Sequence, residues 1–377
     1  MAKPRNGVRL LLLMFGTQAV LLCFFALTRS RFMAGLQAMV SFDGQMCQEV
    51  PKLELHGRIR TSSDSDYDSS NNNFAETGTW NWRPPPGLTD TQERFSGYAK
   101  SSVSILIMVK SGPAYFQERA LLRSLWFNKC ATAGLWHPSR MMKIEEQNGP
   151  SQAAVKCLFM TGRSTNATIT EKLQHESLKN NDMVVGPFWD SYDKMLGKTL
   201  WSLYWSRLRS ERFDYVMLVD DDAYVVFRYL IPWLNGQERT RFYAGHEHLS
   251  TYIIYCEKHP KSKNCVGSDK LKGLSEYPRF PSGFAYIMSH DVVEDGLHQA
   301  LLRISEGLPG NVEDAMVSLL VKSTGVQLKH TPGFVNWFDL AGCPSNSTVL
   351  VAGNAPRDAL VKMNRNDMAR RNICDFT

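Results

Sequence analysis

Three consecutive aspartates, Asp220–Asp222, directly follow the apolar segment "FDYVMLV" (213–219). Adjacent carboxylates repel one another, and an ion that is buried without a partner costs free energy. A Mn²⁺ or Mg²⁺ ion would offset that cost, because both ions prefer oxygen ligands and bridge to substrate phosphates. A solvated acidic turn is the alternative. The apolar residues on both sides of the triplet favour a metal site at the end of a buried strand.

A second acidic pair, Glu313 and Asp314, lies in "NVEDAM" (311–316). A carboxylate can act as a general base that takes a proton from an attacking hydroxyl group. The pair also opens a predicted helix, where acidic residues are common because they interact favourably with the helix dipole. Both interpretations stay open on the residues alone.

The elements that must position these side chains alternate between strand and helix from residue 102 onwards. This order predicts an α/β domain with a mostly parallel sheet and helices on both faces. Ligands of such sheets bind beyond the carboxyl ends of the strands, where Asp220–Asp222 would emerge. No GxGxxG or GxxxxGK[ST] motif opens a helix, so neither a dinucleotide-binding fold nor a P-loop is indicated. The expected strands cover 102–111, 154–162, 182–188 and 213–219, and the expected helices cover 117–128, 169–180 and 191–210.

The N-terminal part has the pattern of a membrane anchor. Leu10–Thr28 is a run without charge, long enough for the roughly 30 Å hydrocarbon core of a bilayer. A cleaved signal peptide is the alternative, but its apolar region is normally only about 7–15 residues long. We therefore predict a cytoplasmic tail (1–9), a signal-anchor helix (10–28), a flexible luminal stem (29–97) and a luminal domain (98–377).

The positive charge of the chain belongs mostly to this anchor. The formal net charge is +6, and residues 1–42 contain five basic residues and no acidic one. The remainder is close to neutral, so the composition indicates no basic face for nucleic acid.

Cysteine usage and glycosylation signals agree with a luminal domain. Apart from Cys23 in the anchor, the cysteines form no CxxC pair and no zinc pattern, and a local disulfide such as Cys256–Cys265 is expected. These seven cysteines are an odd number, so Cys47 is a candidate for a disulfide-linked dimer. The sequons at Asn166 and Asn346 fit a secretory compartment.

Five segments within residues 101–338 carry a resemblance: "RALLRSLWFN", "DSYDKMLGKTLWSLYW", "YVMLVDDDAYVVF", "YPRFPSGFAYIMS" and "VEDAMV". They resemble, in the same order, motifs of the β-1,3-galactosyltransferase and β-1,3-N-acetylglucosaminyltransferase family of Golgi enzymes. The resemblance implies a GT-A-type, Rossmann-like fold, a UDP-sugar donor, Mn²⁺ (or Mg²⁺) and inverting β-1,3 transfer to a glycan on a glycoprotein or glycolipid. It also implies a single-pass type II protein of the Golgi membrane.

By position in these motifs, Asp222 would be the principal metal carboxylate. Asp220 would be a second metal ligand nearer the ribose, and Asp221 would assist in binding the donor. Asp314, or its neighbour Glu313, matches the position of the general base.

Four further residues have weaker support. His330 is the candidate third metal ligand, although a lone histidine is more often structural. Arg123 and Lys198 lie in matched motifs and could meet the diphosphate, with helix capping or ion pairs as the alternative. Asp190 could contact the donor base or ribose, or could cap a helix.

The segment "SGFAY" departs from the family pattern, because Phe284 and Ala285 replace two glycines. We expect the Phe284 ring to fill space that is open in the family. The donor sugar therefore stays open between galactose and N-acetylglucosamine. A non-catalytic chaperone and a metal-binding, lectin-like module are the rival functions. The three adjacent carboxylates favour an enzyme over the chaperone, and the combination of a candidate base with a metal site favours an enzyme over the binding module.

Overall fold

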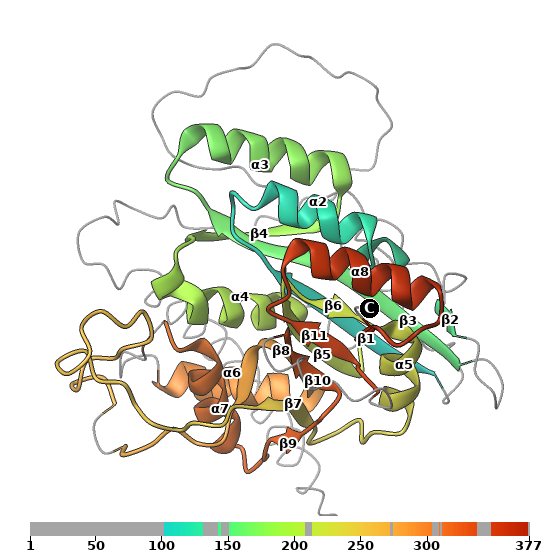
Figure 1. The fold of residues 1–377 in the computed structure, drawn as a ribbon. Helices are drawn as coiled ribbons and strands as arrows, with labels where there is room; N and C mark the ends of the chain where they lie inside the picture. The colour runs from blue at the N-terminus through green and yellow to red at the C-terminus, as the bar shows by residue number, and fades with distance from the viewer. Residues whose placement is uncertain are drawn as a thin grey trace, which may run out of the picture.

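The computed structural model describes residues 102–130, 142–144, 151–207, 213–271, 274–303, 309, 311–337 and 348–375. They form an α/β domain in which helices cover both faces of a large sheet (Figure 1). The strands are β1 (Val103–Lys110), β2 (Met142–Ile144), β3 (Ser151–Arg163), β4 (Met183–Trp189), β5 (Tyr215–Asp220), β6 (Tyr224–Val225), β7 (Tyr243–Glu247), β8 (Pro281–Ser289), β9 (Lys329–His330), β10 (Phe334–Asn336) and β11 (Val351–Gly353). The helices are α2 (Phe116–Ser124), η1 (Phe127–Lys129), α3 (Ala167–Asn180), η3 (Tyr192–Lys194), α4 (Met195–Arg207), α5 (Phe227–Asn235), α6 (His290–Arg303), α7 (Glu313–Lys322) and α8 (Arg357–Met368).

The large sheet has a parallel centre and antiparallel additions. Its order is β2-β3-β1-β5-β8-β7-β9, and β4 also pairs with β3. Strands β4, β3, β1 and β5 are parallel, whereas β8 runs antiparallel to β5 and β7 antiparallel to β8. The predicted parallel sheet is thus confirmed for its centre, where strands buried on both faces read as continuous apolar runs.

Alternate residues of the central strands enter two separate cores. In β1, Ile105 and Ile107 join the core that contains residues of α2, α5 and α8. Leu106 and Met108 join the opposite core, with residues of α4, α6 and α7. This alternation follows from the two-residue period of a strand. The two helical layers therefore flank the edge of the sheet at which β1, β3 and β5 end.

A small second sheet, β10-β11-β6, begins two residues after the aspartate triplet. It explains the replacement of a glycine by Phe284, whose side chain is buried beneath β11. A Cβ atom placed on Gly353 would lie 2.2 Å from Phe284 Cδ2, so the ring occupies the space that this glycine leaves. The ring is therefore part of the core in this chain.

Two disulfides link described cysteines, Cys130–Cys157 and Cys256–Cys265, and the second confirms the local pairing expected from the sequence. Asn166 is exposed, and its Oδ1 accepts a hydrogen bond from Ile169 N (3.2 Å) at the start of α3. The predicted anchor and stem, with Cys47, and the sequon at Asn346 lie outside the described residues. None of the described helices has the length and apolar character needed to span a bilayer.

Candidate active site

The aspartate triplet lies at the edge where the parallel strands end. Asp220 is the last residue of β5 and lies opposite Lys110, the last residue of β1. Asp221 and Asp222 form the turn into β6, and this turn is held by a hydrogen bond from Ala355 N to Asp222 O (3.0 Å). The position is the one predicted from the end of a buried strand.

The pKa values of two of these carboxylates, Asp221 and Asp222, are raised above the ordinary value of an aspartate. Burial, and then the charges of the neighbouring aspartates, raise the pKa of Asp221 to about 7, although the Ser111 hydroxyl acts in the opposite direction. Burial and the Asp220 charge raise the pKa of Asp222 to about 6. Asp221 Oδ2 and Asp222 Oδ1 are both buried without a hydrogen-bond partner. Such oxygens are expensive to leave unmatched, so a cation would be bound favourably here.

These residues fit a metal ion that is held partly by its substrate. Mg²⁺-type ions are commonly bound through one or two carboxylates together with substrate phosphates, rather than by a complete protein cage. Within the described part of the chain, no group of three or more His, Cys, Asp or Glu side chains is arranged to hold a metal. Asp221 and Asp222 therefore offer an incomplete set of oxygen ligands, which a diphosphate could complete.

His330 is not joined to the aspartates in such a group. It lies in β9, where its Nδ1 accepts a hydrogen bond from Glu247 N (3.1 Å). Its ring lies edge-on to that of His246, with 5.5 Å between the ring centroids. His330 is exposed, and its role as the third metal ligand stays a prediction.

Lys110 is a functional candidate that the sequence analysis missed. Its buried Nζ lies 3.1 Å from Asp220 Oδ1 and 3.3 Å from Glu313 Oε2, and it donates to Gly283 O (2.9 Å). Burial acts to lower the pKa of this amine, but Asp220 and Glu313 outweigh burial and raise it above its ordinary value. The available signal was a lone lysine that ends the apolar run 102–109. Lys110 connects the aspartate triplet to the first turn of α7.

The acidic pair of α7 divides into two environments. Glu313 is buried, and its Oε1 accepts hydrogen bonds from Thr199 Oγ1 (2.7 Å) and Tyr286 OH while its Oε2 meets Lys110. Both of its oxygens are therefore engaged inside the protein.

Asp314 is only half-buried and faces the strand edge. One of its oxygens accepts from Ala315 N (2.9 Å), and its Oδ2 would lie 3.2 Å from a Cβ atom placed on Gly283. Burial, and then the charge of Glu313, raise the pKa of Asp314 to about 6. Of the two carboxylates, Asp314 is thus the one placed to exchange a proton with a ligand.

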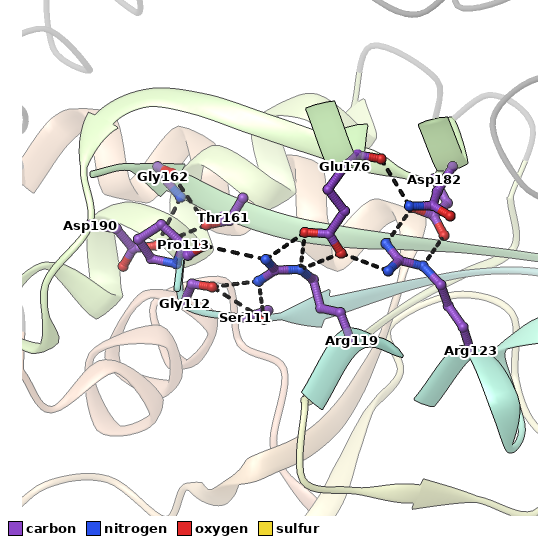
Figure 2. A network of polar contacts seen from close by, with 11 residues as sticks. Ser111, Gly112, Pro113, Arg119, Arg123, Thr161, Gly162, Glu176, Asp182 and Asp190 are labelled. Carbon is purple, nitrogen blue, oxygen red and sulfur yellow. Dashed lines mark hydrogen bonds and ion pairs between the residues drawn. The ribbon is translucent and has the colours of Figure 1, made fainter. Parts of the chain in front are cut away.

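Arg123, Lys198 and Asp190 form ion pairs within the protein. Arg123 contacts Glu176 of α3 (2.6 Å) and Asp182, which precedes β4 (2.7 Å) (Figure 2). Lys198 is buried and contacts Asp190 Oδ2 (2.9 Å), and the same oxygen accepts from Gly162 N (2.8 Å). The contacts of Arg123 and Lys198 are those of the ion-pair alternative, and Asp190 binds a neighbouring strand end rather than capping its own helix.

Arg119, which the sequence analysis noted only as part of a motif, supports the loop after β1. It is fully buried, and Figure 2 shows its guanidinium between α3 and that loop. It contacts Glu176 Oε2 (2.7 Å) and donates to Ser111 Oγ (2.9 Å) and Gly112 O (2.5 Å). Lys198 Nζ donates to Ser111 O (3.0 Å) from the other side. Two buried cations therefore fix the loop that faces Asp221.

Known proteins are similar to this chain in sequence. The galactosyltransferase family model matches residues 117–332, which is more than half of the chain. The chain is 28% identical over 244 residues to β-1,3-galactosyltransferase 1 of Mus musculus and 25% identical over 227 residues to β-1,3-galactosyltransferase 5 of Pan paniscus. These matches cover 62% and 60% of this chain and 64% and 66% of the relatives, slightly less than two thirds of their length.

Among solved structures, apo mouse xyloside xylosyltransferase 1 is 10% identical with a TM-score of 0.32 and covers 68% of this chain and 99% of its own. The apo WbbM bifunctional glycosyltransferase is 10% identical with a TM-score of 0.37 and covers 72% and 52%.

The sheet and its carboxylate-bearing edge define an α/β protein with a candidate site for an anionic ligand and a cation. The family match makes this class specific. The chain belongs to the galactosyltransferase family, and the resemblance read from its five motifs is confirmed.

Proposed function

We propose that the protein is a metal-dependent, inverting β-1,3-glycosyltransferase with a GT-A-type fold, which transfers a sugar from a UDP-sugar to a hydroxyl group of a glycan. Family membership supports the reaction class. The observation that carries the proposal is the pair of buried, unpartnered oxygens of Asp221 and Asp222 at the edge that Asp314 also faces. UDP-galactose is the first candidate donor, and UDP-N-acetylglucosamine is the second.

The aspartate triplet would form the donor side of the site. Asp222 and Asp221 would hold a Mn²⁺ or Mg²⁺ ion, with Asp220 oriented beside them by Lys110. When bound, the ion supplies positive charge that stabilises the diphosphate leaving group. The loop after β1, fixed by Arg119 and Lys198, forms an adjoining wall.

Asp314 would form the acceptor side. As the acceptor hydroxyl oxygen bonds to the anomeric carbon, the bond from that carbon to the diphosphate oxygen breaks, and the hydroxyl proton passes to Asp314. A carboxylate with a pKa of about 6 is largely ionised at neutral pH and still binds a proton better than an ordinary aspartate does. Glu313, whose oxygens are already engaged, would position the helix rather than take the proton.

We further propose that the protein is anchored as a type II membrane protein of the Golgi with its α/β domain in the lumen. The uncharged run Leu10–Thr28, the sequons and the two disulfides support this location.

A donor screen tests the proposed function. The full chain, purified in detergent from a eukaryotic host, is assayed for UDP release from UDP-galactose, UDP-N-acetylglucosamine, UDP-glucose and UDP-N-acetylgalactosamine. We expect one donor to be turned over with Mn²⁺ and none with a chelator. If no donor reacts and calorimetry detects no UDP binding, a non-catalytic role becomes the better account.

A further inference from the structure

The disulfide between Cys256 and Cys265 closes a ten-residue segment, "CEKHPKSKNC", that we call the lysine loop. Lys258, Lys261 and Lys263 are all exposed, and none forms an ion pair with another described residue. The single acidic residue of the loop, Glu257, accepts hydrogen bonds from Ser268 N and Oγ (both 3.0 Å). The loop therefore presents concentrated positive charge to the outside, although the chain beyond the anchor is nearly neutral.

The lysine loop is attached to the body of the domain at two places, Tyr192 and Asn311. Tyr192 OH, in η3 just before α4, donates to Asn264 Oδ1 (2.7 Å), and Lys263 Nζ lies 5.0 Å from the centroid of the Tyr192 ring. On the other side, Asn311 Nδ2 donates to Lys263 O (3.0 Å) and Cys265 O (2.8 Å). With the disulfide, these contacts hold the loop against the regions that begin α4 and α7 (Figure 1, gold segment).

This attachment places the loop beside Asp314. Asn311 precedes Asp314 by three residues and contacts the loop directly. Burial, and then the negative charges of Asp314 and Asp220, raise the pKa of Tyr192. The Tyr192 ring is half-exposed and contacts the lysine loop through Lys263 and Asn264. A glycan whose hydroxyl group reaches Asp314 would extend past Tyr192 and the lysine loop.

We propose that the lysine loop is an acceptor subsite for a glycan that carries negative charge, as sulfate or as uronic acid carboxylate. The proposal rests on the glycosyltransferase function proposed above and names the class of its acceptor. Lysine ammonium groups on flexible stems bind sulfate and carboxylate as point charges and do not require one fixed geometry. A surface that binds a neutral glycan would need no such accumulation of positive charge.

The test compares two variants that lose the same charge. One is Lys258→Ser, Lys261→Ser, Lys263→Ser in the lysine loop. The matched control is Lys172→Ser, Lys179→Ser, Lys362→Ser, at exposed positions of α3 and α8. Calorimetry measures binding of three hexasaccharides to the full chain in detergent: chondroitin sulfate, unsulfated chondroitin and neutral poly-N-acetyllactosamine. UDP binding with Mn²⁺ is measured in parallel.

We expect the parent and the control variant to prefer an anionic hexasaccharide, and the loop variant to bind it about tenfold more weakly, with the difference reduced by salt. Preference for chondroitin sulfate would identify sulfate as the recognised group, and equal binding of unsulfated chondroitin would identify carboxylate. A parent that prefers the neutral hexasaccharide, or an equal loss in both variants, would overturn the proposal.

The UDP measurement separates the two proposals. The loop variant should bind UDP with Mn²⁺ like the parent, because the lysine loop lies on the acceptor side. A parent that binds anionic hexasaccharides but not UDP would contradict the proposed transferase function. A parent that binds UDP but prefers the neutral hexasaccharide would contradict only the acceptor class.

Discussion

Lys110 Nζ lies 3.3 Å from Glu313 Oε2, inside the core, and the same amine lies 3.1 Å from Asp220 Oδ1. One buried cation thus joins the end of β5, which carries the aspartate triplet, to the start of α7, which carries Asp314. The spacing between the proposed donor and acceptor sides depends on this contact. Lys110 is therefore both a stabilising residue and a positioning residue.

Replacing this cation should destabilise the fold strongly. Lys110→Met removes the charge and leaves the buried Glu313 and the half-buried Asp220 without their cation, so we expect the free energy of unfolding to fall by about 3–5 kcal/mol. Urea unfolding followed by tryptophan fluorescence measures this change. The double variant Lys110→Met, Glu313→Gln should lose less than the sum of the two single changes, because one unpaired charge is then absent. Additive losses would show that Lys110 and Glu313 do not interact energetically.

Asp222→Ala should abolish metal-dependent UDP binding and leave the fold intact. The substitution removes a half-buried carboxylate whose Oδ1 has no partner, and it keeps the hydrogen bond from Ala355 N to Asp222 O that holds the turn. Calorimetry with UDP in Mn²⁺ and a thermal unfolding scan measure the two properties separately. Tight UDP binding by this variant would rule out Asp222 as a metal ligand.

Asp314→Asn should retain UDP binding with Mn²⁺ and lose transfer by a factor of about 10²–10⁴, the usual contribution of a general base. The asparagine keeps the size of the side chain and can still accept from Ala315 N. Transfer is measured on the donor that the screen identifies. A transfer rate equal to that of the parent would require a different base.

The transfer rate should also depend on pH through Asp314. The base must be ionised, and its pKa is raised to about 6, so the rate should rise with pH with a midpoint near 6 and level off at neutral pH. Glu313→Gln removes a neighbouring negative charge, which should move this midpoint to lower pH. A pH–rate profile of kcat for both proteins checks the direction, and an unchanged midpoint would contradict the coupling.

The packing of Phe284 beneath β11 predicts a size-dependent compensation. Gly353→Ala would place a methyl group into the Phe284 ring and should destabilise the protein. Phe284→Ala alone should cost about 3–5 kcal/mol through the cavity that it leaves. Unfolding experiments on the double variant should give a loss smaller than the sum. A strictly additive result would mean that the two residues do not share this space.

Local patterns predicted the central elements well. The apolar runs at 102–111, 154–162 and 182–188 became β1, β3 and β4, and the helices at 169–180 and 191–210 became α3 and α4 with small shifts in their ends. Each of these elements buries a face that its own sequence displays, so its type could be inferred from periodicity.

The remaining features depend on contacts between distant residues. Strand β8 joins the sheet antiparallel to β5, more than 60 residues earlier in the chain, and β6 is only two residues long. Neither pairing has a local signature. The same holds for the site, where the charges of Asp220–Asp222 could be read from the sequence but the partners of Lys110, Arg123 and Lys198 could not.

The disulfide Cys130–Cys157 has a consequence for the order of events during biosynthesis. Cys157 is fully buried in β3, and Ile107 of β1 lies opposite it in the sheet. An oxidant cannot reach a sulfur atom in that position once the two strands have packed. The bond therefore has to form before β1 and β3 pack stably against each other. Oxidation of these two thiols thus precedes completion of the core during folding of the nascent domain.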